Sequence, residues 1–167
     1  MAEQDTLNVK VDGSTPSWPT ILFILPKNAV KNYEVLEHTA DIGIRVRAGD
    51  LAGLFKSAGL AITDMSAEKQ KTQYPGKHKF VITQKADNLE ELFVNWLNEL
   101  LSASAVESLI FEDIQINQVN EKFIDAIAIG SDIRNYKVNT EIKAATYHQL
   151  KVQKTGSLWQ AEVIFDV

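Results

Sequence analysis

The amino-acid sequence predicts an α+β fold, in which a mostly antiparallel β-sheet packs against two amphipathic helices. Two observations support this class. Apolar residues recur at three- and four-residue steps in two segments that end by Leu101, which is the period of a helix with one buried face. After Ser108, β-branched and other apolar residues alternate with polar ones, as in strands with one buried face. Early helices followed by adjacent strands favour α+β over alternating α/β.

Each predicted helix has a candidate N-terminal cap. Asp50 can cap the first helix, and Asp87 followed by Glu90 resembles a capping box for the second. The apolar stripe of the first helix comprises Leu51, Leu54, Phe55, Ala58, Ala61, Ile62 and Met65. The stripe of the second comprises Leu89, Leu92, Phe93, Trp96, Leu97, Leu100 and Leu101. We interpret both stripes as core-facing rather than ligand-binding, because such stripes normally bury a helix face.

The remaining regular segments are predicted to be strands. In residues 42–47, Ile42, Ile44 and Val46 alternate with residues that would face solvent, so one face should be buried. The other predicted strands are residues 33–36, 77–83, 114–116, 123–129, 141–145, 149–154 and 158–167. The segment Thr155-Gly156-Ser157 is a plausible hairpin turn between the last two.

The first 32 residues differ from the rest. Residues 1–17 are polar, and the apolar run from Trp18 to Pro26 is too short to span a bilayer. The chain start also lacks the early positive charge of a signal peptide. We predict that residues 1–32 form an N-terminal extension, either an arm that adds a strand or packs on the surface, or a partly disordered segment. Residues 33–167 should form the domain.

Composition restricts the possible functions. Apolar residues make up 45% and charged residues 23%, as in globular rather than membrane proteins. The absence of cysteine excludes disulfides and thiolate metal sites, so any metal would be held by oxygen or imidazole, which favours hard cations. It also suits a cytoplasmic location. With a net charge of −5 and no basic stripe, the chain should contact RNA only through a partner.

Two distant segments could supply carboxylates to a metal ion. Asp41 ends the loop segment Glu37-His38-Thr39-Ala40-Asp41, where it could bind a hard cation or instead form a turn with its own backbone. Asp166 emerges from the more polar face of the last strand, next to the carboxylate of Val167. Together they could bind Ca²⁺ or Mg²⁺ if a third carboxylate arrives from elsewhere. The alternative is a frayed end, but its apolar face predicts a docked strand.

A third segment, residues 143–148, combines a lysine, a phenol and an imidazole. Lys143 could contact a phosphate, and His148 could transfer protons near neutral pH. Regular alternation would place Lys143 and Tyr147 on one face and His148 on the other, so they would converge only if the strand breaks. The alternative is a half-exposed strand with satisfied polar ends. The sequence contains no glycine-rich phosphate loop, so we expect no nucleotide to be bound by this chain alone.

Four segments, in order along the chain, resemble the archease family. They are residues 33–42, residues 92–101, residues 142–148 and the ending Val163-Ile164-Phe165-Asp166-Val167. The resemblance covers residues 33–167. It implies a metal-binding accessory protein, not an enzyme, that activates an RNA ligase of the RtcB type in tRNA splicing and RNA repair. Such proteins promote guanylylation of the ligase with GTP and multiple turnover.

The resemblance also implies site residues. The metal ligands would be Asp41, Asp166 and Val167, with Ca²⁺ as the expected metal and Mg²⁺ or Mn²⁺ as alternatives. Lys143 corresponds to a functional lysine of the family, and we interpret His38 as a positioning residue rather than a ligand. The chain departs from the family pattern in two places. Residues 1–32 precede the usual start, and residues 131–140 lack the histidine often found there.

Two other functions are compatible with the same residues. A stand-alone metal-dependent phosphohydrolase could use Asp41, Asp166, Lys143 and His148 for metal-assisted attack on phosphate. A chaperone-like binding module could carry a purely structural metal. The activator of an RNA ligase is the leading hypothesis, with that ligase as the partner, RNA contacted only indirectly and no membrane association.

Overall fold

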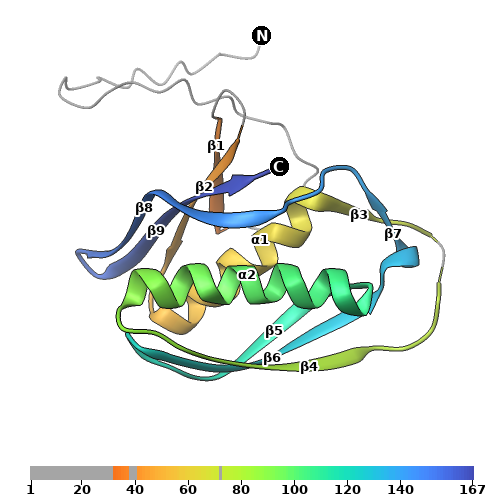
Figure 1. The fold of residues 1–167 in the computed structure, drawn as a ribbon, viewed down its shortest axis with the longest axis horizontal. Coiled ribbons are helices and arrows are strands. Elements are labelled where there is room, and N and C mark those ends of the chain that lie inside the picture. The colour runs from red at the N-terminus through yellow and green to blue at the C-terminus, as the bar shows by residue number, and fades with distance from the viewer. Residues whose placement is uncertain (1–31, 38–40, 72) are drawn as a thin grey trace, which may run out of the picture.

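The computed structural model describes residues 32–37, 41–71 and 73–167, and it confirms the predicted α+β class (Figure 1). The strands are divided among three antiparallel sheets rather than forming a single one. The prediction of an arm or partly disordered extension falls, apart from Asn32, on residues outside the described ones. The described residues contain no helix that is both long and apolar enough to cross a membrane.

The largest sheet has four strands in the order β1-β2-β9-β8. Their bounds are β1 (Tyr33–Glu37), β2 (Ile42–Ala48), β9 (Leu158–Asp166) and β8 (Ala144–Thr155). The second sheet has the order β4-β6-β5, with β4 (His78–Lys85), β6 (Phe123–Asp132) and β5 (Leu109–Val119). A short ribbon pairs β3 (Ala67–Lys69) with β7 (Tyr136–Val138), which follows a 3₁₀ turn at Ile133–Asn135. The sequence analysis did not predict this ribbon.

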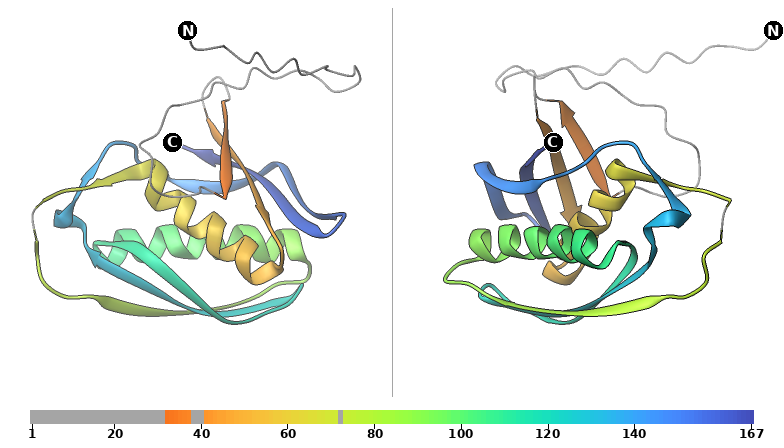
Figure 2. Two further views of the ribbon diagram at one scale, coloured as in Figure 1. Left: turned by 180° about the vertical axis from the view of Figure 1, so that it is seen from behind. Right: turned by 45° about the vertical axis from the view of Figure 1, so that its right-hand side comes forward.

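Both helices, α1 (Leu51–Ser66) and α2 (Leu89–Glu107), lie between the two larger sheets, as Figures 1 and 2 show. This layering explains why α2 buries more than the single stripe expected of a surface helix. Val94 is 1% exposed although it lies outside the predicted stripe, and Trp96 and Leu97 are fully buried. A helix between two sheets must be apolar on two sides, because each side packs against a different sheet.

The helix termini follow the predicted chemistry with one correction. Asp50 caps α1 by accepting a hydrogen bond from the Gly53 backbone N–H at 2.7 Å. For α2 the predicted cap Asp87 is wrong by one residue, since Asn88 accepts the hydrogen bond from the Glu91 N–H at 2.9 Å. The Glu91 carboxylate in turn accepts from the Asp87 N–H at 2.9 Å, so the reciprocal logic of a capping box is kept one position later.

One strand prediction also needs correction. Residues 141–145 and 149–154 were expected to form separate strands, but β8 is one strand with an irregular register between Thr146 and Lys151. It begins at Ala144, so residues 141–143 precede it. The predicted hairpin between β8 and β9 is present, with Gly156 at a φ of 64° in the left-handed region that suits glycine.

The core between the sheets depends on a close approach at Gly59 of α1. A Cβ at this position would lie 2.6 Å from Ile114 Cδ1 and 2.7 Å from Leu100 Cδ1, so any side chain would collide with both. Nearby, Trp96 Nε1 donates a hydrogen bond to the Phe55 carbonyl at 3.1 Å and joins the two helices. Glycine at this position therefore lets α1 pack tightly against α2 and β5.

A second cluster ties the β3–β7 ribbon to β5 through Glu112. Its carboxylate accepts hydrogen bonds from Lys69 Nζ at 2.6 Å, from Lys77 Nζ and from the Tyr136 hydroxyl. Burial alone would raise the pKa of Glu112, but these hydrogen bonds lower the pKa to about 2. Burial and the hydrogen bond to Glu112 raise the pKa of Tyr136 well above its ordinary value. One ionised carboxylate thus holds three segments together.

We predict that Gly59→Val lowers the free energy of unfolding by about 1–3 kcal/mol, because the new side chain overpacks a filled core. Chemical denaturation monitored by circular dichroism would measure the change. Gly49→Ala is the matched control, since a Cβ at Gly49 would meet nothing within 4 Å and stability should stay within about 0.5 kcal/mol. If the Gly59→Val variant were as stable as the wild type, the close packing at this position would be contradicted.

We predict that Glu112→Gln destabilises the protein by about 1–3 kcal/mol at neutral pH, because charged hydrogen bonds are lost. The pKa of Glu112 is lower in the folded state than its ordinary value of 4.5, so its contribution is complete above pH 4.5 and is lost as the pH falls towards 2. The stability difference between variant and wild type should therefore shrink across that range. Urea denaturation at several pH values would measure it, with exposed Glu68→Gln as the control.

Candidate metal centre

The pairing of β2 with β9 brings two carboxylates to the same end of the four-stranded sheet. The ladder runs from Ala48↔Trp159 to Ile42↔Phe165. Asp41 immediately precedes Ile42, and Asp166 immediately follows Phe165. Continuing the antiparallel register by one step sets Asp41 opposite Asp166, and residues in directly opposite positions extend their side chains from the same face of a sheet.

Strand β8 pairs with the other edge of β9 at the end of the chain. Ala144 pairs with Asp166, and the Lys143 backbone N–H donates to the Asp166 carbonyl at 2.9 Å. The Lys143 ammonium donates to a main-chain oxygen of Val167 at 3.0 Å. The candidate residues Asp41, Asp166, Val167 and Lys143 are therefore drawn to one end of the sheet by three adjacent strands (Figure 1).

The end of β9 is firmly docked. Val163 and Phe165 are 1% and 0% exposed, and Val167 packs against the core. Asp166 is exposed on the opposite face, as the alternation along the strand predicts. The frayed terminus that the sequence also allowed is therefore not the observed state of residues 158–166.

The two histidines named by the sequence analysis are not placed in this arrangement. His38 lies outside the described residues. His148 is exposed in the irregular part of β8, beyond Thr146, whose hydroxyl donates to the Ile164 carbonyl at 3.1 Å. The strand does break, as convergence of Lys143, Tyr147 and His148 would require. Lys143 is nevertheless the member of this trio whose hydrogen bonds reach the end of β9.

An asparagine that the sequence analysis did not single out fixes the edge of β8. Asn98 of α2 accepts a hydrogen bond from the Ala145 N–H at 2.8 Å and donates to the Ala145 carbonyl at 3.1 Å. The Asn98 amide thereby bonds the backbone of Ala145 as a neighbouring strand would. Ala145 lies two residues after Lys143. The available signal was weak, because Asn98 is one of several polar residues on α2 and directly follows the buried Leu97.

The nearest acidic residue on the same face of β9 is already neutralised. Glu162 lies four residues before Asp166 and accepts a hydrogen bond from Arg45 Nε at 2.8 Å. Arg45 and Arg47 also bind Glu34, at 3.2 Å and 2.8 Å. Burial opposes the shift, but the two guanidinium groups lower the pKa of Glu34 below its ordinary value. This network engages Glu34 and Glu162 in the middle of the sheet, whereas Asp41 and Asp166 lie at its end.

The donor set fits a hard cation in type but is small. Asp41, Asp166 and the main-chain oxygens of Val167 offer only oxygen, the ligand that Ca²⁺ and Mg²⁺ prefer. Within residues 32–37, 41–71 and 73–167, no group of three or more His, Cys, Asp or Glu side chains is arranged to hold a metal. Water would therefore have to supply much of the coordination shell of any bound ion.

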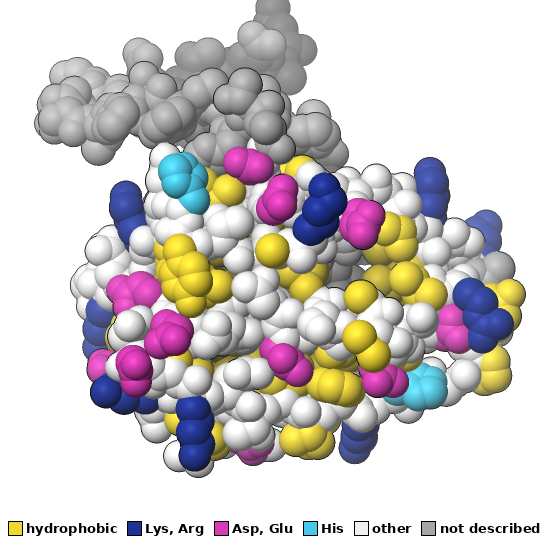
Figure 3. All heavy atoms as spheres, in the orientation of Figure 1, with side chains coloured by type: hydrophobic (Ala, Val, Ile, Leu, Met, Phe, Trp, Pro, Cys, Tyr) yellow, Lys and Arg dark blue, Asp and Glu magenta, His cyan; other side chains and the backbone are white. Residues whose placement is uncertain are grey.

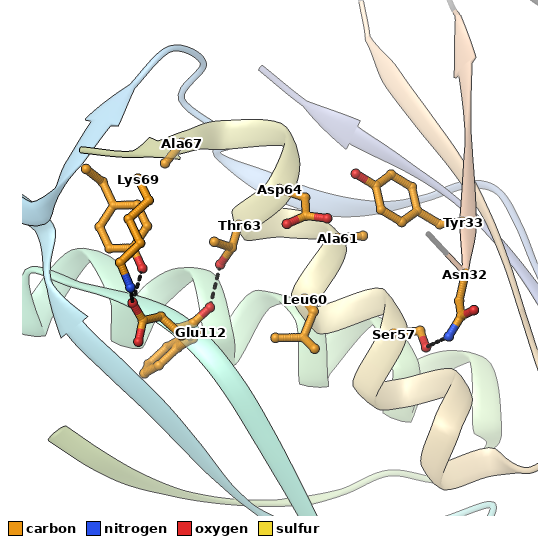
Figure 4. Close-up of a pocket in the computed structure, with 12 residues that line it drawn as sticks. Asn32, Tyr33, Ser57, Leu60, Ala61, Thr63, Asp64, Ala67, Lys69 and Glu112 are labelled. Atoms are coloured by element: carbon orange, nitrogen blue, oxygen red, sulfur yellow. Dashed lines mark hydrogen bonds and ion pairs between the residues drawn. The ribbon is translucent and has the colours of Figure 1, made fainter. Parts of the chain in front are cut away.

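A cavity of about 540 Å³ lies away from this centre, between α1, the start of β1 and the β3–β7 ribbon (Figure 4). Several of its polar groups have partners in the fold. The Thr63 hydroxyl donates to the Phe111 carbonyl at 2.8 Å, and Lys69 binds Glu112. These contacts stabilise the fold around the cavity.

The described residues on one face of the molecule do not form an extended basic surface. On the face shown in Figure 3, basic and acidic side chains are interspersed rather than gathered into a stripe of one sign. This pattern agrees with the net charge of −5. Nucleic-acid sites normally concentrate Lys and Arg on one surface.

Comparison with known proteins gives a consistent result. Residues 33–167 match the model of the Archease protein family. The chain is 34% identical over 143 residues to Protein archease of Methanosarcina barkeri, covering 82% of this chain and 97% of that protein. It is 32% identical over 144 residues to Protein archease of Pyrococcus abyssi, covering 83% of this chain and 100% of that protein.

Solved structures agree at the level of the fold. The solution structure of Methanobacterium thermoautotrophicum protein 1598 superimposes with a TM-score of 0.63 at 24% identity, covering 83% of this chain and 100% of that one. A Thermotoga maritima structure described as an archease and possible chaperone gives a TM-score of 0.55 at 20% identity, covering 79% and 94%. The family match and the curated relatives together show that this chain belongs to the archease family.

Proposed function

We propose that this protein is a metal-binding accessory protein that activates an RNA ligase of the RtcB type in tRNA splicing and RNA repair. It promotes guanylylation of the ligase with GTP and so allows multiple turnover, while the ligase carries out the chemistry. The observation that supports this proposal most directly is the register of β2 and β9, whose ladder ends at Ile42↔Phe165, with Asp41 directly preceding Ile42 and Asp166 directly following Phe165.

In this proposal the carboxylates of Asp41 and Asp166 and the main-chain oxygens of Val167 hold a divalent cation, with Ca²⁺ expected and Mg²⁺ or Mn²⁺ as alternatives. The bound cation would supply a concentrated positive charge that can orient an anionic group of the partner. Carboxylates in opposite strand positions lie about 5 Å apart and repel by roughly 1 kcal/mol in water and roughly 3 kcal/mol at an effective dielectric of about 20. A cation between them offsets this repulsion.

Lys143 has a positioning role in the same centre. Its ammonium bonds Val167 and its backbone bonds Asp166, so it orients the end of β9 from the β8 side. It also places a compact positive charge next to the carboxylates, where it can contact a phosphate of the ligase complex. His38 is proposed to position the loop that carries Asp41, and His148 remains a candidate on the neighbouring edge.

The remaining proposals concern the setting of this activity. The protein acts in the cytoplasm, a compartment that suits a chain without cysteine. It reaches RNA only through the ligase, because its net charge of −5 disfavours gripping nucleic acid alone. It binds no nucleotide by itself, since its sequence holds none of the glycine-rich phosphate loops.

We predict that Asp41→Asn and Asp166→Asn each weaken Ca²⁺ binding and reduce stimulation of ligase guanylylation by at least about 10-fold. Loss of a neighbour that only orients a metal ligand already costs about 10- to 100-fold in affinity, and loss of a ligand itself should cost no less. Isothermal titration calorimetry would measure binding, and transfer of labelled GTP to the cognate ligase would measure stimulation. Glu121→Gln, an exposed carboxylate in the β5–β6 turn, is the matched control.

Three outcomes would contradict the proposal. Equal stimulation by both Asn variants and the wild type would exclude a role for the metal centre. If chelation lowers the melting temperature but the Asn variants still stimulate, the metal is structural, as in a chaperone-like binding module. If the isolated protein turns over phosphoesters with Mg²⁺ or Mn²⁺, it is a phosphohydrolase rather than an accessory protein.

A further inference from the structure

Edge strand β8 leaves its regular pairing at residues 147–150, a segment that we call the β8 bulge. Thr146 pairs with Ile164 and Lys151 pairs with Glu162. Residues 147–150 of β8 therefore face only Val163 of β9. Extra residues on one strand push its backbone out of the ladder and redirect its side chains, and such bulges are common at sheet edges and beside functional sites.

The β8 bulge carries a conformation that is unfavourable for its residues. Gln149 has a φ of 53°, in the left-handed region that side chains other than those of glycine rarely adopt. Strained backbone of this kind persists where the surrounding structure requires it, and it is concentrated at binding and catalytic sites. Here Val163 is 1% exposed and Leu150 packs against the core, whereas residues 147–149 are exposed.

The result is an exposed aromatic ring beside the candidate metal centre. Tyr147 is 59% exposed, and His148 and Gln149 are exposed as well. The bulge begins two residues after Ala145, where Asn98 fixes the edge strand. Its first flanking pair is Thr146 with Ile164, and Ile164 lies two residues before Asp166 on β9.

Strand β8 itself carries no acidic residue. Between Glu141 and Glu162 there is no Asp or Glu, whereas residues 143, 151 and 154 are lysines and residue 148 is histidine. The side chains of Lys151 and Lys154 belong to exposed residues. In a chain with a net charge of −5, β8 thus contributes only basic side chains to this edge, and its exposed Lys151 and Lys154 would attract an acidic surface.

We propose that the β8 bulge, together with Lys151 and Lys154, is the docking surface for the protein partner of the metal centre. The partner offers acidic side chains around an apolar slot that receives the Tyr147 ring. This inference rests on the proposed function, because the partner is the ligase that the centre activates. Exposed tyrosines that become buried at an interface are frequent anchors of binding energy, and flanking charges set orientation and association rate.

The charge distribution favours a protein partner over RNA. A nucleic-acid site of ordinary strength neutralises several phosphates, and proteins with about 6–10 such contacts are typical examples. The β8 edge offers three lysines, of which Lys143 already bonds Val167 and Lys151 lies opposite Glu162. A tyrosine anchor with a few flanking charges is the usual composition of a protein interface.

Titration of ligase stimulation against the concentration of this protein tests the proposal. We expect Tyr147→Ala and Lys151→Glu to raise the half-maximal concentration by at least about 10-fold while leaving the maximal stimulation unchanged. Asp41→Asn should instead lower the maximum at every concentration. Tyr147→Phe, which keeps the ring, should remain within about threefold of the wild type.

Matched controls lie on the three-stranded sheet. Val81→Ala removes an apolar side chain that is 65% exposed on β4, and Lys79→Glu reverses a charge on the same strand. Neither should shift the half-maximal concentration. Thermal unfolding of Tyr147→Ala should match the wild type within about 2 °C, because truncating an exposed side chain changes stability little.

Three results would overturn the docking surface. Unchanged half-maximal concentrations for both bulge variants, with normal stimulation by the wild type, would overturn this inference and leave the proposed function intact. A wild-type protein that neither binds nor stimulates the ligase would overturn both. If Tyr147→Ala abolishes binding of a single-stranded RNA oligonucleotide and leaves ligase affinity unchanged, the surface recognises RNA instead.

Discussion

The position of β9 between β2 and β8 is the constraint on which the rest of this structure depends. A strand in the interior of a sheet bonds on both edges, so β9 fixes the register of two partners that are far apart in sequence. Its inner face, with Ala161, Val163 and Phe165 almost fully buried, also closes the core above the helices. The position of the candidate centre follows from this pairing, because the β2–β9 ladder ends where β2 begins and β9 ends.

The helices provide the rigidity that such a site needs. They lie between two sheets, and each side of α2 contacts a different one. Asn98 uses this position to hold the edge of β8 through a paired amide contact, which keeps Lys143 and the end of β9 in register. Satisfying both backbone groups of an edge residue also removes a place where another chain could add as a strand. The Asn98 contact therefore both positions β8 and protects its edge.

The carboxylates of this protein differ in their surroundings. Glu112 is surrounded by hydrogen-bond donors that lower its pKa to about 2, and Glu162 and Glu34 are bound by arginines. These groups join strands and turns to one another. Asp41 and Asp166 instead occupy the end of a sheet, beside the lysine that bonds Val167.

The sequence alone determined what depends on local periodicity: the α+β class, both helices, the alternation of β2 and β9, and the hairpin at Gly156. It also identified Asp41, Asp166, Val167 and Lys143 as candidates, partly through resemblance to the family. The tertiary structure alone decided the division into three sheets, the ladder that sets Asp41 opposite Asp166, the Asn98 contact and the β8 bulge. The physical reason is that periodicity records which face of an element is buried, whereas register and bulges depend on how distant strands fit against each other.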